Sequence, residues 1–234
     1  MVSVMKQLEK LKINNIMSVL EFIRLNENSS KKYIASMTGL SSTLLTNICN
    51  QLKEKNLIIE GDVLSSNKAG RREISLNINY SLKKIIGINF SSEYCEVVIT
   101  DLKPTLLFVK RFNINLEDNN QILSSIEEII LGYIKKNNLS LSDFAGIGIS
   151  SKGTTDTKKG IVGEDFLVKK LEIKELLNKK IDLPIFVEND VKALSIAQNF
   201  FFPEYRDFFL VKYSIHGIGG GVFKDGLLCT NVDN

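Results

Sequence analysis

The feature that most limits the fold of this chain is a glycine set inside an otherwise helical stretch. Residues 33–48 read YIASMTGLSSTLLTNI, with apolar side chains at helical spacing on both sides of Gly39. A glycine in a helix interior costs about 1 kcal/mol relative to alanine, so it usually marks a turn, a helix end or a close approach. Serines follow directly, and serine is favoured at helix starts. The stretch therefore predicts two short helices that meet at a turn.

The sequence on either side completes a small module around this turn. Apolar side chains recur at helical spacing before it, Ser29 and Ser30 are suited to cap the next helix, and a polar loop with Gly70 near its tip separates two strand-like segments. Three helices followed by a two-stranded hairpin predict a winged helix-turn-helix. The predicted helices span residues 8–26, 31–37 and 41–56, and the predicted strands span 57–61 and 72–79.

Individual positions inside the motif support this prediction. Ala35 is small where two helices must cross closely, and Gly39 lies where the turn needs an unhindered or left-handed backbone. Leu40, Leu45 and Ile48 supply the apolar face that holds the second helix against the first. The alternative is a purely structural bundle or a module that docks a protein partner, since many such joints bind no DNA.

A DNA-binding function predicts which side chains face the nucleic acid. The helix after the turn would lie in the major groove, where short hydroxyls and an amide contact base edges or phosphates. Basic side chains at the wing suit phosphate or a narrow minor groove. The alternatives are helix capping for the first two serines and a solvated turn for the wing. The candidates are Ser41, Ser42, Thr43, Thr46 and Asn47 on the helix, and Lys68, Arg71 and Arg72 at the wing.

The distribution of charge agrees with this placement, although the net charge of +3 is weak. Residues 1–80 hold 11 Lys and Arg against 7 Asp and Glu, whereas residues 81–234 hold 19 against 20. The positive excess therefore lies in the N-terminal third, where a phosphate-binding module needs it.

The pattern changes between residues 77 and 84, which places the domain boundary there and predicts domains over 1–80 and 81–234. Strands and helices alternate from this point, which predicts an α/β domain with a sheet flanked by helices. Strands are expected over 83–90, 95–102, 105–114 and 144–153, helices over 118–138 and 191–201, a short helix and strand over 175–190, and a hairpin over 207–229.

Several function classes find no support in the sequence. The three cysteines are far apart in the sequence without a CxxC pair, and with the single histidine, His216, they lack the ligand spacing of a structural zinc site, so we expect no metal. No apolar run approaches the roughly 20 residues of a membrane span, and the N-terminus lacks a signal-peptide core. We therefore expect a cytoplasmic protein without a membrane partner.

The order of motifs in both domains resembles the ROK family, named for repressors, open reading frames and sugar kinases. The stretch VEND at 187–190, followed by GIGGG at 217–221, is the most specific part. The other matching segments are GRREISLNIN, IGINFSSEYCEVVITDL and GIGISSKGTTDTKKGIV. The resemblance implies the repressor branch, in which a winged helix precedes a sugar-kinase-like domain of the actin-like ATPase (ribonuclease H-like) fold.

The resemblance also implies a sugar site at Asn189 and Asp190, whose matching positions contact sugar hydroxyls in the family. Asp190 matches the family's catalytic base, a carboxylate that takes a proton from a sugar hydroxyl. The alternative for Asp190 is an N-cap of the following helix. Lys192 stands where the family often has Asn.

Two departures from the family pattern argue against catalysis. Kinases of the family carry Asp-x-Gly-Gly-Thr on the first hairpin, and this chain has Asn89 with Ser91 and Ser92, whose side chains would block close approach of a phosphate. The second hairpin has Ile215 and His216 in place of Gly-Thr, which leaves GIGGG as a glycine-rich loop or a tight hairpin. We therefore expect no nucleotide cofactor and no enzyme activity.

Later motifs of the family, a Glu-x-Gly-His segment and a zinc-binding cysteine cluster, are absent, so we expect a C-terminally truncated member, with a reduced fold as the alternative. A sheet cut midway exposes an edge, and the apolar segment 208–215, FFLVKYSI, would need a partner. Marginal stability or dimerisation is expected.

The leading hypothesis is a sugar-responsive transcriptional repressor of carbohydrate genes, of the xylose type, that binds a palindromic double-stranded operator as a homodimer and releases it when a small sugar binds. One alternative is a ROK sugar kinase with an N-terminal extension. A second alternative is a truncated DNA-binding protein that senses no ligand.

Overall fold

The computed structural model describes residues 2–64, 73–91, 93–114, 118–162, 170–214 and 217–229, with only the backbone for residues 2–8. Contacts divide the chain into two compact units, Met1–Leu82 and Lys83–Asn234. Each unit has its own apolar core, and each is described by itself below.

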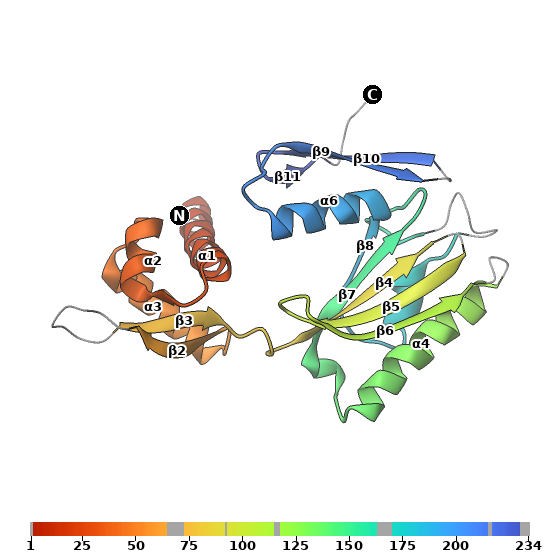
Figure 1. Ribbon diagram of the computed structural model, residues 1–234, viewed down its shortest axis with the longest axis horizontal. Helices are drawn as coiled ribbons and strands as arrows, with labels where there is room; N and C mark the ends of the chain where they lie inside the picture. Colours follow the sequence, from red (N-terminus) through yellow and green to blue (C-terminus); the bar gives the residue numbers. More distant parts are fainter. Residues whose placement is uncertain are drawn as a thin grey trace. The chain divides into compact units, whose positions relative to one another are not determined.

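The first unit consists of three helices and a small antiparallel sheet (Figure 1). Its sheet has the order β1-β3-β2, so the predicted hairpin of β2 and β3 gains a third strand. This strand was not predicted: Ser29 and Ser30 pair with Leu76 and Ser75. The elements are α1 (Val2–Leu25), β1 (Ser29–Ser30), α2 (Lys31–Thr38), α3 (Ser42–Glu54), β2 (Ile58–Leu64) and β3 (Glu73–Ile78).

The turn between α2 and α3 has the local structure that the sequence predicts. Gly39 ends α2 in the left-handed conformation, with φ 70°, and its N–H donates to the carbonyl of Ala35 at 3.1 Å. Ser30 caps α2 by accepting from the Tyr33 amide, and Ser41 caps α3 by accepting from the Leu44 amide. The prediction of two helices joined at a glycine turn is confirmed.

The core of the first unit fixes how α3 is presented. Leu45 and Ile48 on α3 are buried against Val19 and Ile23 of α1 and Ile34 of α2. These residues share one apolar cluster, as expected from their helical spacing. The opposite face of α3 is therefore turned to solvent.

The second unit is built on a five-stranded sheet with the order β6-β5-β4-β7-β8 (Figure 1). The first three strands form an antiparallel meander, while β7 and β8 run parallel to β4. Its strands are β4 (Lys84–Phe90), β5 (Tyr94–Asp101), β6 (Leu106–Asn113), β7 (Phe144–Ser151) and β8 (Ile185–Asn189). The predicted α/β character of this part of the chain is confirmed.

One face of this sheet packs against α4 (Asn119–Lys136) and α5 (Ile173–Asn178), with the short 3-10 helix η1 (Leu141–Asp143) leading into β7. Alternate residues of β4, namely Ile86, Ile88 and Phe90, are buried on this face together with Ile126 of α4. The residues between them, including Gly87 and Asn89, therefore lie on the other face.

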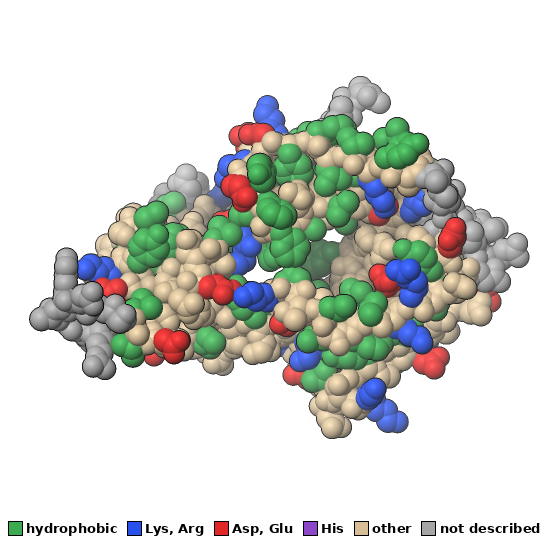
Figure 2. All heavy atoms as spheres, viewed as in Figure 1, with side chains coloured by type: hydrophobic (Ala, Val, Ile, Leu, Met, Phe, Trp, Pro, Cys, Tyr) green, Lys and Arg blue, Asp and Glu red, His purple; other side chains and the backbone are tan. Residues whose placement is uncertain are grey.

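The chain then continues into α6 (Asp190–Phe201), which lies beneath a second antiparallel sheet of β9 (Phe208–Ser214), β10 (Gly217–Lys224) and β11 (Leu227–Leu228) (Figure 1). The outer side of this sheet is rich in exposed apolar side chains, and Figure 2 shows them gathered over this part of the molecule. They include Phe209, Val211 and Tyr213 on β9, with Ile218 and Val222 on β10. That this segment needs a partner remains a prediction.

Among the described residues, no helix is both long and apolar enough to cross a bilayer.

Candidate functional site

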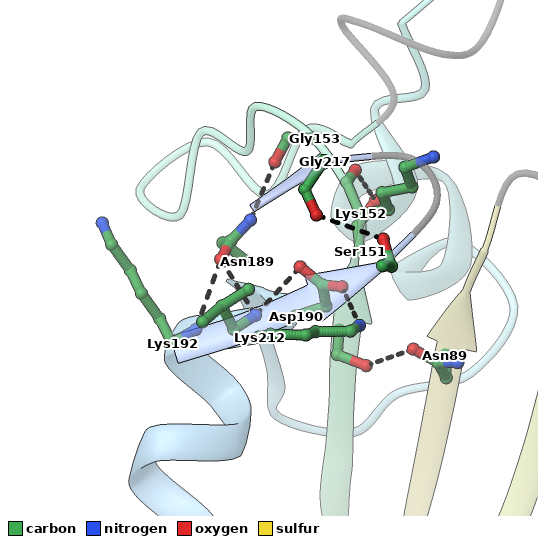
Figure 3. Close-up of polar contacts among 12 residues, drawn as sticks. Asn89, Ser151, Lys152, Gly153, Asn189, Asp190, Lys192, Lys212 and Gly217 are labelled. Atoms are coloured by element: carbon green, nitrogen blue, oxygen red, sulfur yellow. Dashed lines mark hydrogen bonds and ion pairs between the residues drawn. The ribbon is translucent and has the colours of Figure 1, made fainter. Parts of the chain in front are cut away.

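The Asn-Asp pair predicted to contact a sugar lies at the junction of β8 and α6 (Figure 3). Asn189 is the N-cap: its Oδ1 accepts from the amides of Val191 at 3.0 Å and Lys192 at 3.3 Å. Its Nδ2 donates to the carbonyl of Gly153 at 3.0 Å, which ties the helix start to the loop after β7. The alternative in which Asp190 caps the helix is wrong, because Asn189 occupies that position.

Asp190 is the first residue of α6, and its side chain is 13% exposed. Its Oδ1 accepts from the Val191 amide at 2.9 Å, and its Oδ2 accepts from Lys212 Nζ at 2.5 Å. Lys212 comes from β9, where it is the one basic residue of the strand Phe208–Ser214. Both carboxylate oxygens of Asp190 therefore already accept a hydrogen bond from the protein.

Sequence reasoning missed Lys212. The available signal was a lysine inside the otherwise apolar run FFLVKYS, since a charge in such a strand usually has a specific partner. A carboxylate, a side-chain amide and an ammonium group combine hydrogen-bond acceptors and donors in a small volume, which is chemistry suited to hydroxyl groups.

The first hairpin, between β4 and β5, is closed by a serine side chain. Ser91 Oγ accepts from the amides of Glu93 at 3.2 Å and Tyr94 at 3.0 Å, and donates to the Tyr94 carbonyl at 3.1 Å. Asn89 Oδ1 accepts from Ser150 Oγ at 2.8 Å. The amides at this turn are thus already satisfied within the hairpin, whereas Ser92 lies outside the described residues.

The glycine-rich segment 217–221 forms the first part of strand β10 and not a loop. A Cβ built on Gly219 would lie 2.5 Å from Val191 Cγ2, and one on Gly221 would lie 2.1 Å from Ser195 Oγ. Both contacts are with α6, so these glycines allow the helix to approach the strand closely. The alternative of a glycine-rich loop at 217–221 is therefore wrong, whereas the alternative of a hairpin agrees with the antiparallel pairing of β9 and β10. Ile215 and His216 lie outside the described residues.

A cavity of about 320 Å³ lies between α6 and the sheet face that α4 does not cover. Gly87 and Gly148 of the sheet line it, together with the apolar side chains of Phe186 on β8 and Ile196 on α6. Its polar lining comes from Asn89, Ser150, Glu96 and Glu188. The Glu188 carboxylate accepts from the Asn189 amide at 2.9 Å, so the cavity adjoins the Asn-Asp pair.

The DNA-contact candidates of the first unit fall into two groups. Those of α3 are exposed on the face opposite its buried residues, and Ser41 also serves as the helix cap. The same face continues one turn further to exposed Asn50, which sequence reasoning missed although the helical period would have found it. The exposed candidates are Ser41, Ser42, Thr43, Thr46 and Asn47, while Lys68, Arg71 and Arg72 lie outside the described residues.

Two of the cysteines, Cys49 and Cys95, are buried. Burial raises the pKa of the Cys95 thiol to about 12, and burial also raises the pKa of the Cys49 thiol. Within the described part of the chain, no three His, Cys, Asp or Glu side chains come together as metal ligands.

Comparison with known proteins places these sites in context. A family model described as the ROK family matches residues 85–232. The xylose repressor of Caldicellulosiruptor bescii is 24% identical over 223 residues, covering 93% of this chain and 55% of that protein. The chain therefore spans little more than half the length of this curated relative.

Two solved structures show similar folds. The crystal structure of a ROK family transcriptional regulator, a homologue of the Escherichia coli Mlc protein, superposes with a TM-score of 0.74 at 22% identity and covers 93% of this chain and 56% of that chain. A ROK hexokinase from Thermus thermophilus superposes with a TM-score of 0.52 at 20% identity, covering 64% of this chain and 48% of its own.

Proposed function

This chain belongs to the ROK family, and from that premise we propose that it is a sugar-responsive DNA-binding transcriptional regulator, a repressor of carbohydrate genes of the xylose type. The observation that carries the proposal is the extent of the match to the xylose repressor, which takes in 93% of this chain and therefore runs through both units. A similarity limited to the second unit would not separate a regulator from a kinase.

The first unit is proposed to act as a winged helix-turn-helix. The buried side chains Leu45 and Ile48 hold α3 against the other helices and leave its polar face in solvent. On that face Thr43, Thr46 and Asn47 would reach base edges, and Ser42 a phosphate. The segment between β2 and β3, with Lys68, Arg71 and Arg72, would contact the DNA backbone.

The second unit is proposed to hold the effector at Asn189 and Asp190. A sugar bound between the start of α6 and β9 would contact two elements at once, since Lys212 on β9 already contacts Asp190 across this gap. Binding of the sugar would then favour one arrangement of the two elements. Such differential binding is what allows an effector to change DNA affinity.

Catalysis is not part of the proposal. The hairpin that would carry a nucleotide phosphate has its amides at Glu93 and Tyr94 satisfied by Ser91 Oγ. Two glycines of β10, Gly219 and Gly221, lie against α6. Without a bound phosphoryl donor, a sugar hydroxyl that gave its proton to Asp190 would have no phosphoryl group to accept, so the kinase alternative loses its support.

The regulator is proposed to act in the cytoplasm as a homodimer on a palindromic operator, because a two-fold symmetric protein binds two half-sites one helical turn apart.

The proposal is tested by selecting duplexes from a random pool with the full chain, then measuring affinity by fluorescence anisotropy between 50 and about 200 mM salt. We expect selection of a palindromic site, and release of that site on addition of a sugar. Failure to bind any duplex at low salt would overturn the DNA-binding part. Phosphorylation of a sugar with ATP would instead support the alternative that the chain is a sugar kinase.

The face of α3 is tested separately with Thr46→Ala. We expect loss of discrimination at one base pair by about 1–2 kcal/mol, with other positions of the site unaffected. Equal loss on all sequences would instead assign Thr46 to a phosphate contact. Because Thr46 is exposed, the thermal unfolding midpoint should stay unchanged and serves as the control for folding.

A further inference from the structure

We propose that the cavity between α6 and the five-stranded sheet binds an aromatic organic cation, in which a flat ring is joined by a short alkyl chain to an ammonium group. The cavity of about 320 Å³ has the size of a small-ligand site, and neither the DNA site nor the sugar site proposed above uses it. The inference therefore goes beyond the proposed function. It starts from the order of the residues on the sheet face that lines the cavity.

Four residues on neighbouring strands form an apolar row across this face. The strand register pairs Gly87 of β4 with Val98 of β5 on one side and with Gly148 of β7 on the other. Gly148 pairs in turn with Phe186 of β8, which is 72% exposed. Two adjacent glycines therefore leave a hollow between a valine and an exposed aromatic ring.

The space above Gly148 is open. A Cβ built on Gly148 would meet nothing within 4 Å, whereas one on Gly87 would lie 2.6 Å from Val98 Cγ2. Ile196 of α6, which is 45% exposed, lines the cavity from the helix. A flat ring placed over Gly148 can thus contact the apolar side chains of Phe186 and Ile196.

A second row, two residues further along each strand, is polar. Asn89 pairs with Glu96 and with Ser150, and Ser150 pairs with Glu188. Asn89 and Ser150, in the middle of the row, hydrogen-bond to each other at 2.8 Å (Figure 3). Both rows line the cavity, because side chains two residues apart on a strand share a face. The carboxylates therefore stand at the ends of the polar row, about 6–7 Å along the strands from the apolar row.

The polar row has an unbalanced negative charge. Arg111 of β6 donates to Glu96 Oε1 from Nε at 2.9 Å and from Nη2 at 2.7 Å, and so neutralises that carboxylate. Glu188 accepts from the Asn189 amide at 2.9 Å, but among the described residues no lysine or arginine forms an ion pair with it. A ligand ammonium would supply the cationic partner that Glu188 lacks in the described part of the chain.

The spacing of the two rows sets the shape of the ligand. A ring over Gly148 and a charge at Glu188 must be separated by about 6–7 Å, which is two residues along a strand. A chain of two carbons between an aromatic ring and an ammonium group spans this separation. Tryptamine has this arrangement and is the probe. Tryptophol and indole-3-acetate carry a neutral hydroxyl and a carboxylate on the same ring, so the three compounds isolate the effect of charge.

The test is isothermal calorimetry with the full chain. We expect tryptamine to bind at least ten times more tightly than tryptophol, and indole-3-acetate to bind most weakly. Ethylamine, which has the charge without the ring, should bind at least ten times more weakly than tryptamine. Tryptophol or ethylamine binding as tightly as tryptamine would overturn the proposal, and so would the absence of tryptamine binding at millimolar concentration.

Glu188→Gln tests the charge. It should lower the affinity for tryptamine about tenfold and leave tryptophol within twofold, while the glutamine oxygen can still accept from the Asn189 amide. The matched control is Glu128→Gln, which removes the same charge from an exposed residue of α4, on the other face of the sheet. Equal losses in the two variants would assign the effect to net charge and overturn the role of Glu188.

Gly148→Ala tests the place of the ring. The added methyl meets no protein atom but occupies the space above the strand, so tryptamine and tryptophol should both bind about tenfold more weakly. The free energy of unfolding should not fall, because alanine in a strand is favoured over glycine where space allows. Unchanged affinity for tryptamine in this variant would place the ligand elsewhere and overturn the proposal.

A second copy of the chain is the other candidate to cover this sheet face. Affinity for tryptamine that falls as the protein concentration rises would show that the copies cover the face themselves, and would overturn the ligand site. Operator selection and its response to sugars are measured without tryptamine. Failure of the cavity to bind the probe therefore leaves the proposed function standing.

Discussion

Two glycine-containing segments, one in each unit, position the candidate residues for different physical reasons. Gly39 has φ 70° and nothing within 4 Å of the place where a Cβ would stand, so glycine is needed there for its backbone conformation. Gly219 is needed for space, because a Cβ would lie 2.5 Å from Val191 Cγ2. The first glycine sets where α2 ends, and the second sets how closely α6 approaches β10. The reason for a glycine, whether backbone conformation or space, therefore cannot be read from the sequence pattern without the positions of the neighbouring atoms.

The largest effect is expected for Gly219→Ala. The added methyl meets a branched side chain on a helix, where χ1 has little freedom, so the contact can only be relieved by moving α6. Overpacking of this kind costs about 1–3 kcal/mol. Urea unfolding followed by circular dichroism measures the change in the free energy of unfolding.

Val191→Ala provides the matched test of the cause. Without its γ carbons, the nearest atom of residue 191 to the new methyl is Cβ at 3.5 Å, an ordinary contact. The double variant Gly219→Ala with Val191→Ala should therefore recover part of the loss, with a coupling of about 1 kcal/mol in a double-mutant cycle. If the free-energy changes of the two single variants simply add in the double variant, contact with Val191 is not the reason for a glycine at position 219.

The next effect is expected for Gly39→Ala. An alanine in the left-handed conformation costs about 1–2 kcal/mol, although no atom obstructs its methyl. Gly39→Asn should cost less, because asparagine tolerates this conformation. Equal costs for alanine and asparagine, again from urea unfolding, would show that the backbone conformation is not the cause and would break the contrast with Gly219.

The two segments also show what the sequence could and could not predict. The turn at Gly39 and the helix caps are local, because each depends on residues within four positions. Spacing therefore predicted the turn and a serine cap for each helix, and the structure selects Ser30 over Ser29 and Ser41 over Ser42. Strand β1 was missed because two serines carry no strand pattern, and they pair with β3 more than 40 residues away. The alternating strands of the second unit were predicted because burial on one face leaves a period of two.

The candidate site was predicted only in part, for the same reason. Asn189 and Asp190 were found through the family resemblance, but the assignment of the cap between them required the backbone geometry of Asn189. The partner of Asp190 lies 22 residues away on another element, and no spacing rule connects Lys212 to it. The role of Gly219 likewise depends on α6, so the pattern GIGGG alone left a glycine-rich loop and a tight hairpin open.

A smaller effect is expected where the turn at Gly39 meets α3. Ser41→Ala removes the side chain that accepts from the Leu44 amide at 3.3 Å, and losing an N-cap costs about 1 kcal/mol. Ser42→Ala is the matched control, since Ser42 is equally exposed but is the first residue inside the helix. A larger loss of stability in Ser41→Ala would assign the capping role to Ser41. A larger loss of operator affinity in Ser42→Ala would assign the DNA contact to Ser42. The reverse outcome would exchange these roles.

The smallest effect is expected at a third glycine, Gly132, which has neither a left-handed backbone nor a close neighbour. Gly132 lies inside α4 with ordinary helical backbone and with nothing within 4 Å of its would-be Cβ. Alanine there fits without strain and restricts the unfolded chain, so Gly132→Ala should stabilise the second unit by about 0.5–1 kcal/mol. Thermal unfolding measures this gain. A loss instead would mean that open space and a helical backbone do not suffice to predict the outcome, and the reasons assigned to Gly39 and Gly219 would then need another explanation.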